Sequence, residues 1–530
     1  MAVVCGAHVS AAADPMVVRI EGGTIHGKTE GEVQAWKGIP FAAPPVGALR
    51  WRAPQSVKPW KNVLETSAFR PDCMQTEDVA NISEDCLYLN VFRPAARTEK
   101  PLPVMVWVYG GALVRGGASL YPGEGLARQG VLVVTFNYRL GRLGFFAHPA
   151  LAREAPNEPR GNYGFLDQIA ALRWVRRNIA AFGGDPNKVT IFGESAGGGS
   201  VLVQMTSPMS RGLFHQAIVQ SAGLPTARAA AMPLRELSAA EKIAVDYASA
   251  LGIGGADAAA LAALRSVPAE KLVAGSDSNA VLWELSGGPE VPGVAGAMRD
   301  GRLVVESPEA AMRAGRQAKI PVLSGATDHD LATGNARTKE ELWSFFGPLS
   351  TRARKLYDPD GNAELSALVQ DVHADRVMVE PSRHLAEAMT RAGQPAYFYR
   401  FSYVAESRRT QVPGAPHATD LAFTFHLPSR IAGDQTTYAD WAMAQTLSSY
   451  WVAFAKTGNP NSAGRLVWQT YDPRRRDVLN FTNDGVVFGP DPLRARLDLW
   501  KGVFQDTPAA VISVRRPASP GRPVNAPARR

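Results

Sequence analysis

VTIFGESAG, residues 189–197, is the stretch of sequence that decides the fold. Its first four residues are a continuous apolar run rich in β-branched side chains, typical of a strand buried on both faces of a mostly parallel sheet. GESAG then matches the G-x-S-x-G pattern of a sharp turn from strand into helix, in which the neighbours of the serine must be small. Residues 197–205, GGGSVLVQM, can continue as a helix whose N-terminus favours developing negative charge. Ser195 is therefore the candidate nucleophile.

The surrounding sequence predicts a large sheet with helices packed on it. Residues 163–182 carry apolar side chains at helical spacing, which gives the order strand, helix, strand. Alanine-rich segments at 227–264 and 364–392 predict helices laid over the strands, where such folds build a lid. Short apolar runs broken by Gly and Pro at 17–95 predict small antiparallel strands. Further strands are expected at 104–109, 131–137, 216–220, 320–325 and 396–401.

Length and composition fit one large enzyme domain. The chain has 530 residues, of which 45% are hydrophobic and 20% charged, and no apolar run is long enough for a membrane helix. We predict an α/β fold in which a large, mostly parallel central sheet is flanked by helices and carries helical lid insertions, as a single catalytic domain at 17–504. Residues 1–16 are expected to be a tail or the remnant of an export signal, and 505–530 a disordered basic tail rich in Pro and Arg.

The net charge and the cysteine count exclude several functions. The formal charge is +8, but five arginines and no acid follow Asp506, so the main body is only weakly basic and we expect no nucleic-acid partner. Three cysteines are too few for a disulfide framework or a four-ligand zinc site. Cys73 and Cys86 could close one loop in an oxidising compartment.

A glycine pair after the expected strand at 104–109 is the candidate oxyanion loop. Gly110 and Gly111 allow the backbone to approach a substrate closely, and Ala112 follows them. The N–H groups of Gly111 and Ala112, together with that of Ala196, would hold the tetrahedral oxygen.

A general base and an orienting acid are expected later in the chain. His417, in GAPHATDLAF, lies in a loop after the expected strand at 396–401, whereas its rival His426 resembles a packed segment end. The segment PVLSGATDHDL offers Asp328 and Asp330 as the acid, and spacing alone does not choose between them. The same two acids with His329 could bind a metal, but no second ligand cluster accompanies them, so we expect none.

These motifs together resemble the type-B carboxylesterase family, which has the α/β-hydrolase fold. The resemblance covers about residues 17–504 and rests on EDCLYLNV (84–91), VWVYGGA (106–112), FNYRLGRLGF (136–145), GNYGFLDQ (161–168) and FGESAGG (192–198). It implies a serine carboxylic ester hydrolase that works through an acyl-enzyme and needs no cofactor. Aligning GATDHDL with the family's acid pattern places Asp330 at the position usually held by Glu. Because Asp is one methylene shorter than Glu, the loop that carries it must come closer to His417.

The resemblance also implies supporting contacts. Ser221, in QSAG, is similar to a serine that supports the acid, and Glu194 would support the site beside the nucleophile. Family pairing implies a Cys73–Cys86 disulfide, which favours a periplasmic or secreted location over a cytoplasmic one. It further implies two structural ion pairs, Arg50 with Glu84 and Arg139 with Asp167.

Several properties of the enzyme stay open at this level. Choline esters are not expected as substrates, because the loop between the two cysteines lacks the tryptophan that holds a quaternary ammonium. Alternatives are a lipase, an esterase for a bulky polyester toxin or xenobiotic, and a catalytically silent adhesion protein that keeps the fold. We expect a monomer or weak homo-oligomer. Because the base must be neutral, activity should fall below roughly pH 6.

Overall fold

The computed structural model of the chain describes residues 14–76, 79, 81–223, 234–285, 290–332 and 334–505. The two expected tails lie outside these ranges apart from residues 14–16 and 505, and so does the beginning of the alanine-rich segment expected at 227–264. Among the described helices, none has the length and apolar character needed to cross a membrane.

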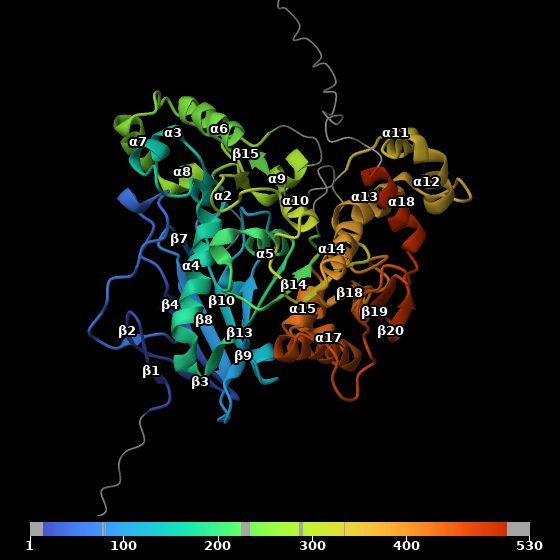
Figure 1. Cartoon of the computed structure of the whole chain (residues 1–530), viewed down its shortest axis with the longest axis horizontal. Coiled ribbons are helices and arrows are strands. Elements are labelled where there is room, and N and C mark those ends of the chain that lie inside the picture. Colours follow the sequence, from blue (N-terminus) through green and yellow to red (C-terminus); the bar gives the residue numbers. More distant parts are fainter. Residues whose placement is uncertain are drawn as a thin grey trace, which may run out of the picture.

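The centre of the molecule is an eleven-stranded mixed sheet (Figure 1). Its order is β20-β19-β18-β17-β14-β13-β9-β10-β8-β4-β3. Every neighbouring pair from β10 to β19 is parallel, and the strands at both edges are antiparallel. The strands are β3 (Lys28–Glu30), β4 (Val33–Pro40), β8 (Tyr88–Pro94), β9 (Leu102–Val108), β10 (Leu132–Phe136), β13 (Gly184–Glu194), β14 (Gln216–Gln220), β17 (Val322–Thr327), β18 (Ala396–Phe401), β19 (Asp477–Thr482) and β20 (Gly485–Pro490).

The register of the parallel strands brings the candidate site residues to one edge. Gly193 of β13 pairs with Val108 of β9, so the elbow and the glycine loop leave the sheet side by side. On the other side, Glu194 pairs with Gln220 of β14, which in turn pairs with Gly325 of β17. Ligand sites of parallel sheets lie at these carboxyl ends.

The early strands contribute more to the sheet than the sequence predicts. β3, β4 and β8 extend the central sheet as an antiparallel edge, whereas β1 (Val17–Ile20), β2 (Gly23–His26) and β5 (Leu64–Glu65) form a separate small sheet. At the opposite edge, the hairpin of β19 and β20 has no counterpart among the expected strands.

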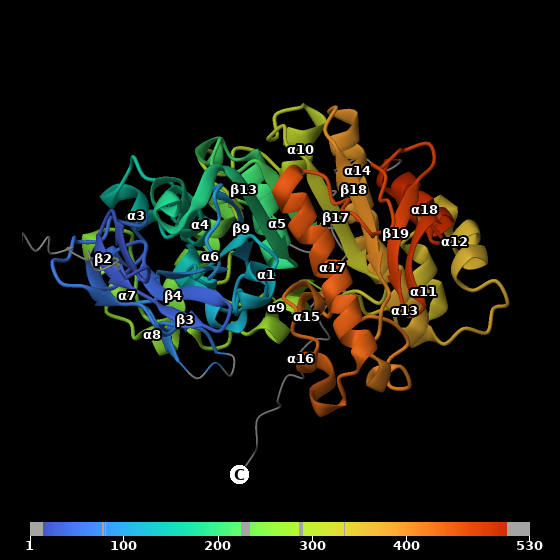
Figure 2. The ribbon, with the colours of Figure 1, turned by 90° about the horizontal axis from the view of Figure 1, so that it is seen from below.

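Long helices cover the sheet (Figures 1 and 2). Helix α5 (Ala196–Thr206) packs on β13 and β14, and α14 (Glu380–Arg391) packs on β17 and β18. Helix α17 (Tyr438–Thr457) packs on β9, β13 and the short α15 (Asp420–Thr424), and both views show α15 beside α17. The expected helix at 163–182 is α4 (Tyr163–Asn178) followed by a 3₁₀ turn at Ile179–Phe182.

Two further groups of helices lie at the top of Figure 1 and overlap the expected lid segments at 227–264 and 364–392 only in part. The first group is α6 (Leu237–Ala250), α7 (Ala258–Arg265), α8 (Ala269–Val273) and α9 (Ser278–Leu285). The second group is α11 (Lys339–Ser344), α12 (Ser350–Tyr357) and α13 (Leu365–Ala374), which runs through a π-helical turn at Asp375–Val379 into α14.

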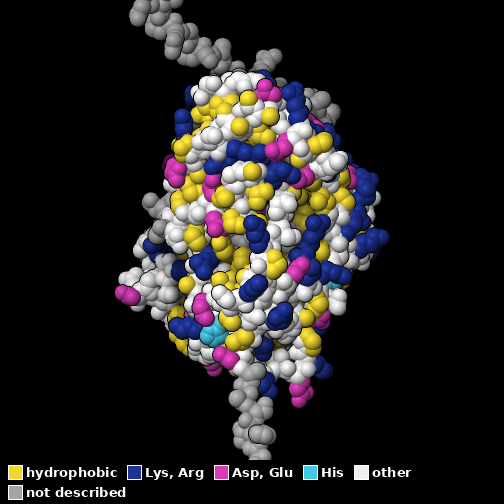
Figure 3. Space-filling view, turned by 90° about the vertical axis from the view of Figure 1, so that its left-hand side faces the viewer, with side chains coloured by type: hydrophobic (Ala, Val, Ile, Leu, Met, Phe, Trp, Pro, Cys, Tyr) yellow, Lys and Arg dark blue, Asp and Glu magenta, His cyan; other side chains and the backbone are white. Residues whose placement is uncertain are grey.

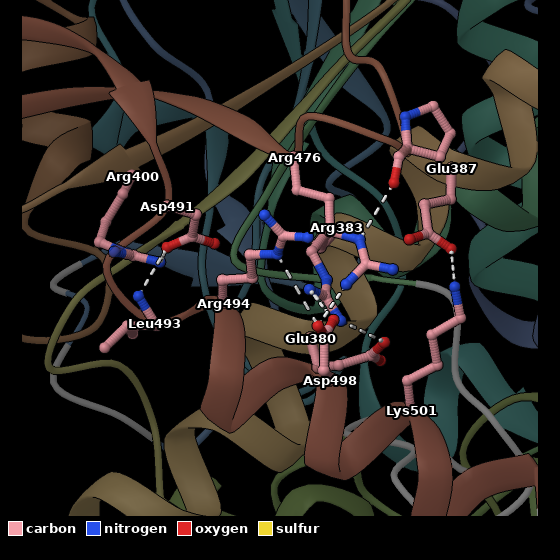
Figure 4. Close-up of polar contacts among 11 residues, drawn as sticks. Glu380, Arg383, Glu387, Arg400, Arg476, Asp491, Leu493, Arg494, Asp498 and Lys501 are labelled. Atoms are coloured by element: carbon pink, nitrogen blue, oxygen red, sulfur yellow. Dashed lines mark hydrogen bonds and ion pairs between the residues drawn. The ribbon is translucent and has the colours of Figure 1, made fainter. Parts of the chain in front are cut away.

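A cluster of ions fastens the last described helix, α18 (Arg494–Gln505), to α14 (Figure 4). Arg383, whose side chain is fully buried, donates to Asp498 at 2.9 Å and lies 3.7 Å from Glu380. Lys501 donates to Glu387 at 2.7 Å. We call these five residues the α14–α18 ion cluster. Each acid in the cluster has a cation within 4 Å, as buried charges require.

The surface toward the N-terminal strands is chemically mixed. Figure 3 shows Lys and Arg side chains interspersed with acidic and hydrophobic ones on this face. The positive charge on this face is therefore not gathered into one basic field of the kind that binds phosphate backbones.

Candidate active site

The turn at Ser195 has the backbone strain that its motif predicts. Ser195 follows β13 directly and has φ +54°, a left-handed value that is costly for a residue with a side chain. Its N–H donates to the Gln220 carbonyl at 3.0 Å. A methyl group on Gly197 would lie 2.1 Å from the Val108 carbonyl oxygen, so only glycine fits there. Crowding by the neighbouring strand thus explains the small residues around Ser195.

The glycine loop after β9 lies against the nucleophile. A methyl group on Gly110 would lie 3.1 Å from Cβ of Ser195 and 2.6 Å from the carbonyl oxygen of Glu194. Gly111 and Ala112 both have positive φ, +100° and +55°, and in the described part of the chain their N–H groups have no protein partner. Ala196 begins α5, where an N–H lies outside the helical ladder. Three free donors are therefore available beside Ser195.

Asp330 is the carboxylate that contacts His417. Its Oδ1 lies 2.5 Å from Nδ1 of the imidazole, and its side chain is fully buried. Its other oxygen accepts hydrogen bonds from the Ser221 hydroxyl at 2.7 Å and from the Thr327 N–H at 3.0 Å. These bonds and the positive charge of the histidine outweigh burial and lower the pKa of Asp330. The group therefore stays ionised and is held in one orientation.

Asp328, the alternative acid, has a different partner. Its Oδ1 accepts from the Ala415 N–H at 2.7 Å, while the His329 N–H donates to the Ala415 carbonyl at 3.2 Å. The acid loop is thereby fastened to the chain just before His417. This bridge brings the shorter aspartate of the acid loop within reach of the imidazole.

His417 lies among acids on both sides. Its Nε2 is 3.2 Å from Oε1 of Glu194, opposite the contact with Asp330. Burial alone would lower the pKa of His417, but the charges of Glu194 and Asp330 reverse that effect and raise it to about 9. Burial raises the pKa of Glu194 to about 8. With this raised pKa of His417, we expect the acid limit of activity to lie above the value near pH 6 that an ordinary histidine predicts.

Asp420 is a buried acid that the sequence reasoning missed. Burial raises its pKa to about 6, and its Oδ2 accepts from Gln220 Nε2 at 2.9 Å and from the Tyr399 hydroxyl at 3.1 Å. It lies three residues after His417, and its charge contributes to the raised pKa of that histidine. The available signal was a single acid at the start of the run DLAFTF, which otherwise carries no charge.

The rival histidine lies elsewhere. The ring of His426 is tilted against that of Trp441, with 5.4 Å between ring centroids, and burial lowers the pKa of His426. This setting agrees with the packed segment end expected for it.

Comparison with known proteins agrees with this geometry. The profile described as "Carboxylesterase family" matches residues 14–500. The chain belongs to this family. It is 36% identical over 509 residues to fumonisin B1 esterase of Sphingopyxis macrogoltabida, covering 91% of this chain and 90% of the relative. It is 34% identical to para-nitrobenzyl esterase of Bacillus subtilis (strain 168), and the alignment covers 87% of this chain and 94% of that relative. A solved structure of PNB esterase aligns with TM-score 0.77 and 33% identity over 92% of this chain and 99% of that one.

This carboxylesterase is thus an α/β-hydrolase that hydrolyses carboxylic esters, as its motifs predict. The structural pairs implied by the family are also present. Cys73 and Cys86 form a disulfide with a Cα–Cα distance of 5.0 Å. The other two pairs are two-pronged guanidinium–carboxylate contacts, Arg50 with Glu84 and Arg139 with Asp167.

Proposed function

We propose that this carboxylesterase works through an acyl-enzyme, with Ser195 as nucleophile, His417 as general base and Asp330 as the acid that orients the base. The observation that carries the proposal is the 2.5 Å contact between the His417 ring and Asp330, in which the opposite ring nitrogen lies 3.2 Å from Glu194, the residue before the strained turn at Ser195. A serine needs an adjacent base to become a strong nucleophile, and the base needs a group that fixes its tautomer.

In the proposed cycle, His417 takes the proton of Ser195 as the serine oxygen attacks the ester carbonyl. The N–H groups of Gly111, Ala112 and Ala196 hold the oxyanion of the tetrahedral intermediate. The intermediate collapses, the alcohol leaves with the proton from His417, and water then repeats the sequence to release the acid. Glu194 and Asp420 add negative charge near the imidazole, which stabilises the imidazolium formed in each transition state.

Small to medium carboxylic esters are the first candidate substrates. A large ester is the second candidate, because the relative that shares 36% identity over 91% of this chain is named for its action on fumonisin B1. Choline esters remain disfavoured by the loop between Cys73 and Cys86, which contains no tryptophan. A silent adhesion role is disfavoured because the serine, the base and the acid are all present.

The disulfide supports export to an oxidising compartment, where such bonds persist. We propose residues 17–504 as one catalytic domain that acts as a monomer or weak homo-oligomer. Mass measurement of the protein isolated from cells under alkylating, non-reducing conditions tests the location. Full alkylation of Cys73 and Cys86 would contradict export.

The experiment that tests the function is hydrolysis of p-nitrophenyl acetate and butyrate by the wild type and by Ser195→Ala, His417→Ala and Asp330→Ala. We expect the first two variants to lose at least about 10⁴-fold in kcat and the third somewhat less. An inert wild type, or a Ser195→Ala variant that still turns over, would overturn the proposal.

A further inference from the structure

An aliphatic wall formed by residues 291–294, which follow the first lid group in the chain, packs against the oxyanion loop. Val291 and Val294 are buried and form a small apolar cluster with Val114. Ala112 of the oxyanion loop packs against this cluster, together with Ala280 and Val281 of α9. Ala112 is only partly buried, so this residue of the oxyanion loop is still reached by solvent. The group of a substrate that lies beside Ala112 therefore meets short aliphatic side chains.

A single buried arginine holds the lid segments that carry this wall. Arg142, in α2 (Gly141–Gly144), is 2% exposed. Its guanidinium donates to the carbonyls of Leu272 at 2.7 Å, Ala274 at 3.0 Å and Pro292 at 2.8 Å. Pro292 lies between the two wall valines, so the contact acts directly on the wall.

The pocket around this guanidinium is built for it. Among the described residues Arg142 forms no ion pair, and the face of Tyr247 lies 4.5 Å from its central carbon instead. Gly293 has φ +74°, and a methyl group there would lie 2.8 Å from Nε of Arg142 and 2.6 Å from the Tyr247 ring. Burying a cation without an acid costs folding free energy unless hydrogen-bond acceptors surround its donors. The three carbonyls and the Tyr247 ring supply this environment for Arg142.

The same short helix is tied to the oxyanion loop. The Gly141 N–H donates to the Leu113 carbonyl at 2.8 Å, and Leu113 has φ +63°. The contacts thus link the oxyanion loop to α2, α2 to the lid carbonyls through Arg142, and the wall valines back to Ala112. A change at Arg142 is therefore transmitted to the space beside the oxyanion hole.

We propose that Arg142 is a positioning residue that sets the size of the aliphatic substrate group accepted beside Ala112. The inference rests on the proposed function and narrows it to esters whose group at this wall is short and unbranched. We call the bonds from Arg142 to the three lid carbonyls the clamp. With the clamp intact, the wall valines stay packed against Ala112, and substrates with short aliphatic chains are favoured. Without it, the lid segments relax and longer chains enter.

The test compares p-nitrophenyl acetate with p-nitrophenyl octanoate in Arg142→Met, Arg142→Lys and Val294→Ala. We expect the ratio of kcat/KM for octanoate to that for acetate to rise about tenfold in Arg142→Met, mainly through KM, as for a pocket enlarged by one or two methylenes. Arg142→Lys keeps the charge but has fewer donors, so its ratio should lie between those of the wild type and Arg142→Met. Val294→Ala opens the wall directly and should raise the ratio with the clamp in place.

A matched control separates this effect from general destabilisation. Arg383→Met removes a buried guanidinium from the α14–α18 ion cluster and should leave the ratio unchanged. Hydrogen exchange of residues 272–285 and 290–294 gives a measure that is independent of turnover, and Arg142→Met should exchange faster there than the wild type.

Unchanged exchange in Arg142→Met, or an unchanged ratio in both Arg142→Lys and Val294→Ala, overturns the inference. The last two variants decide the matter if Arg142→Met does not fold. A wild type that hydrolyses neither ester would instead contradict the proposed function, and hydrogen exchange would still test the clamp.

Discussion

Two buried charged regions of this carboxylesterase are built on opposite rules. Around His417, the carboxyl groups of Glu194 and Asp330 contact the imidazole, and the charge of Asp420 also acts on it. In the α14–α18 ion cluster, Arg383 and Lys501 lie within 4 Å of the acids they neutralise (Figure 4). The first region concentrates acids around one base, whereas the second places a cation within 4 Å of each acid.

The difference appears in the proton affinities. The pKa of His417 is raised to about 9 by neighbouring acids, and burial raises that of Glu194 to about 8. In the ion cluster, burial raises the pKa of Glu380, whose cation is 3.7 Å away, to about 7. Acids gathered around one imidazole tune a base, while acids that each have a cation nearby hold helices together.

The largest expected effect tests the acid at the site. Asp330→Asn keeps the shape of the side chain but favours the wrong tautomer of His417, so kcat for p-nitrophenyl butyrate should fall about 10⁴-fold. Asp328→Asn is the matched control, because Asp328 bonds the backbone of Ala415 rather than the imidazole. It should cost no more than about tenfold. Similar losses in the two variants would refute the assignment.

The second effect tests the ion cluster. Arg383→Met leaves buried Glu380 without its nearest cation and should lower the free energy of unfolding by about 3–5 kcal/mol in urea denaturation. The folded fraction should retain the kcat of the wild type. Arg494 lies 4.0 Å from Asp498 with its side chain 48% exposed, so Arg494→Met should cost less than about 1 kcal/mol. A large loss of kcat in folded Arg383→Met would show that the two regions are coupled.

The third effect tests how acids tune the base. Only neutral His417 accepts a proton, so kcat/KM should rise with pH through its raised pKa, above the ordinary value of about 6.5. Glu194→Gln removes the charge that raises the pKa of His417 most. It should therefore move the acid limb of the profile, the pH range in which kcat/KM rises, downward by about one pH unit. Glu387→Gln in the ion cluster should leave the limb in place. An acid limb at the same pH in Glu194→Gln and in the wild type would contradict the claim that the charge of Glu194 raises the pKa of His417.

The smallest effect concerns Asp420. Its charge also raises the pKa of His417, but it ranks below Glu194 and Asp330 among the causes. Asp420→Asn should therefore move the same limb downward by only about half a pH unit. The pH profile of kcat/KM measures this shift beside that of Glu194→Gln, and a larger shift in Asp420→Asn would reverse the proposed order.

The parts of the structure that the sequence predicts are those that depend on residues close together in the chain. Strand periodicity and the G-x-S-x-G turn predict β13 and the strain at Ser195, because both depend on neighbouring residues. The antiparallel edge strands β3, β4 and β8 were expected only as small strands, because their place in the central sheet depends on pairing across long stretches of chain.

The electrostatics of the site could not be predicted in the same way. The choice between Asp328 and Asp330 was left open by spacing and made by family resemblance, and the structure separates them through their bonds to Ala415 and His417. The expected limit near pH 6 assumed an ordinary histidine. The raised pKa predicts a higher limit, because the charges of Glu194 and Asp420, both distant from Asp330 in sequence, act on the same ring.

The central claim is that Ser195 carries the acyl group, and covalent trapping tests it most directly. Diethyl p-nitrophenyl phosphate should release one equivalent of p-nitrophenol per active molecule, abolish ester hydrolysis and leave a diethylphosphoryl group on Ser195, located by peptide mass spectrometry. Stoichiometric labelling of Ser195 is the predicted result. Inactivation with the label on another residue, or full activity after Ser195 is labelled, would contradict the account.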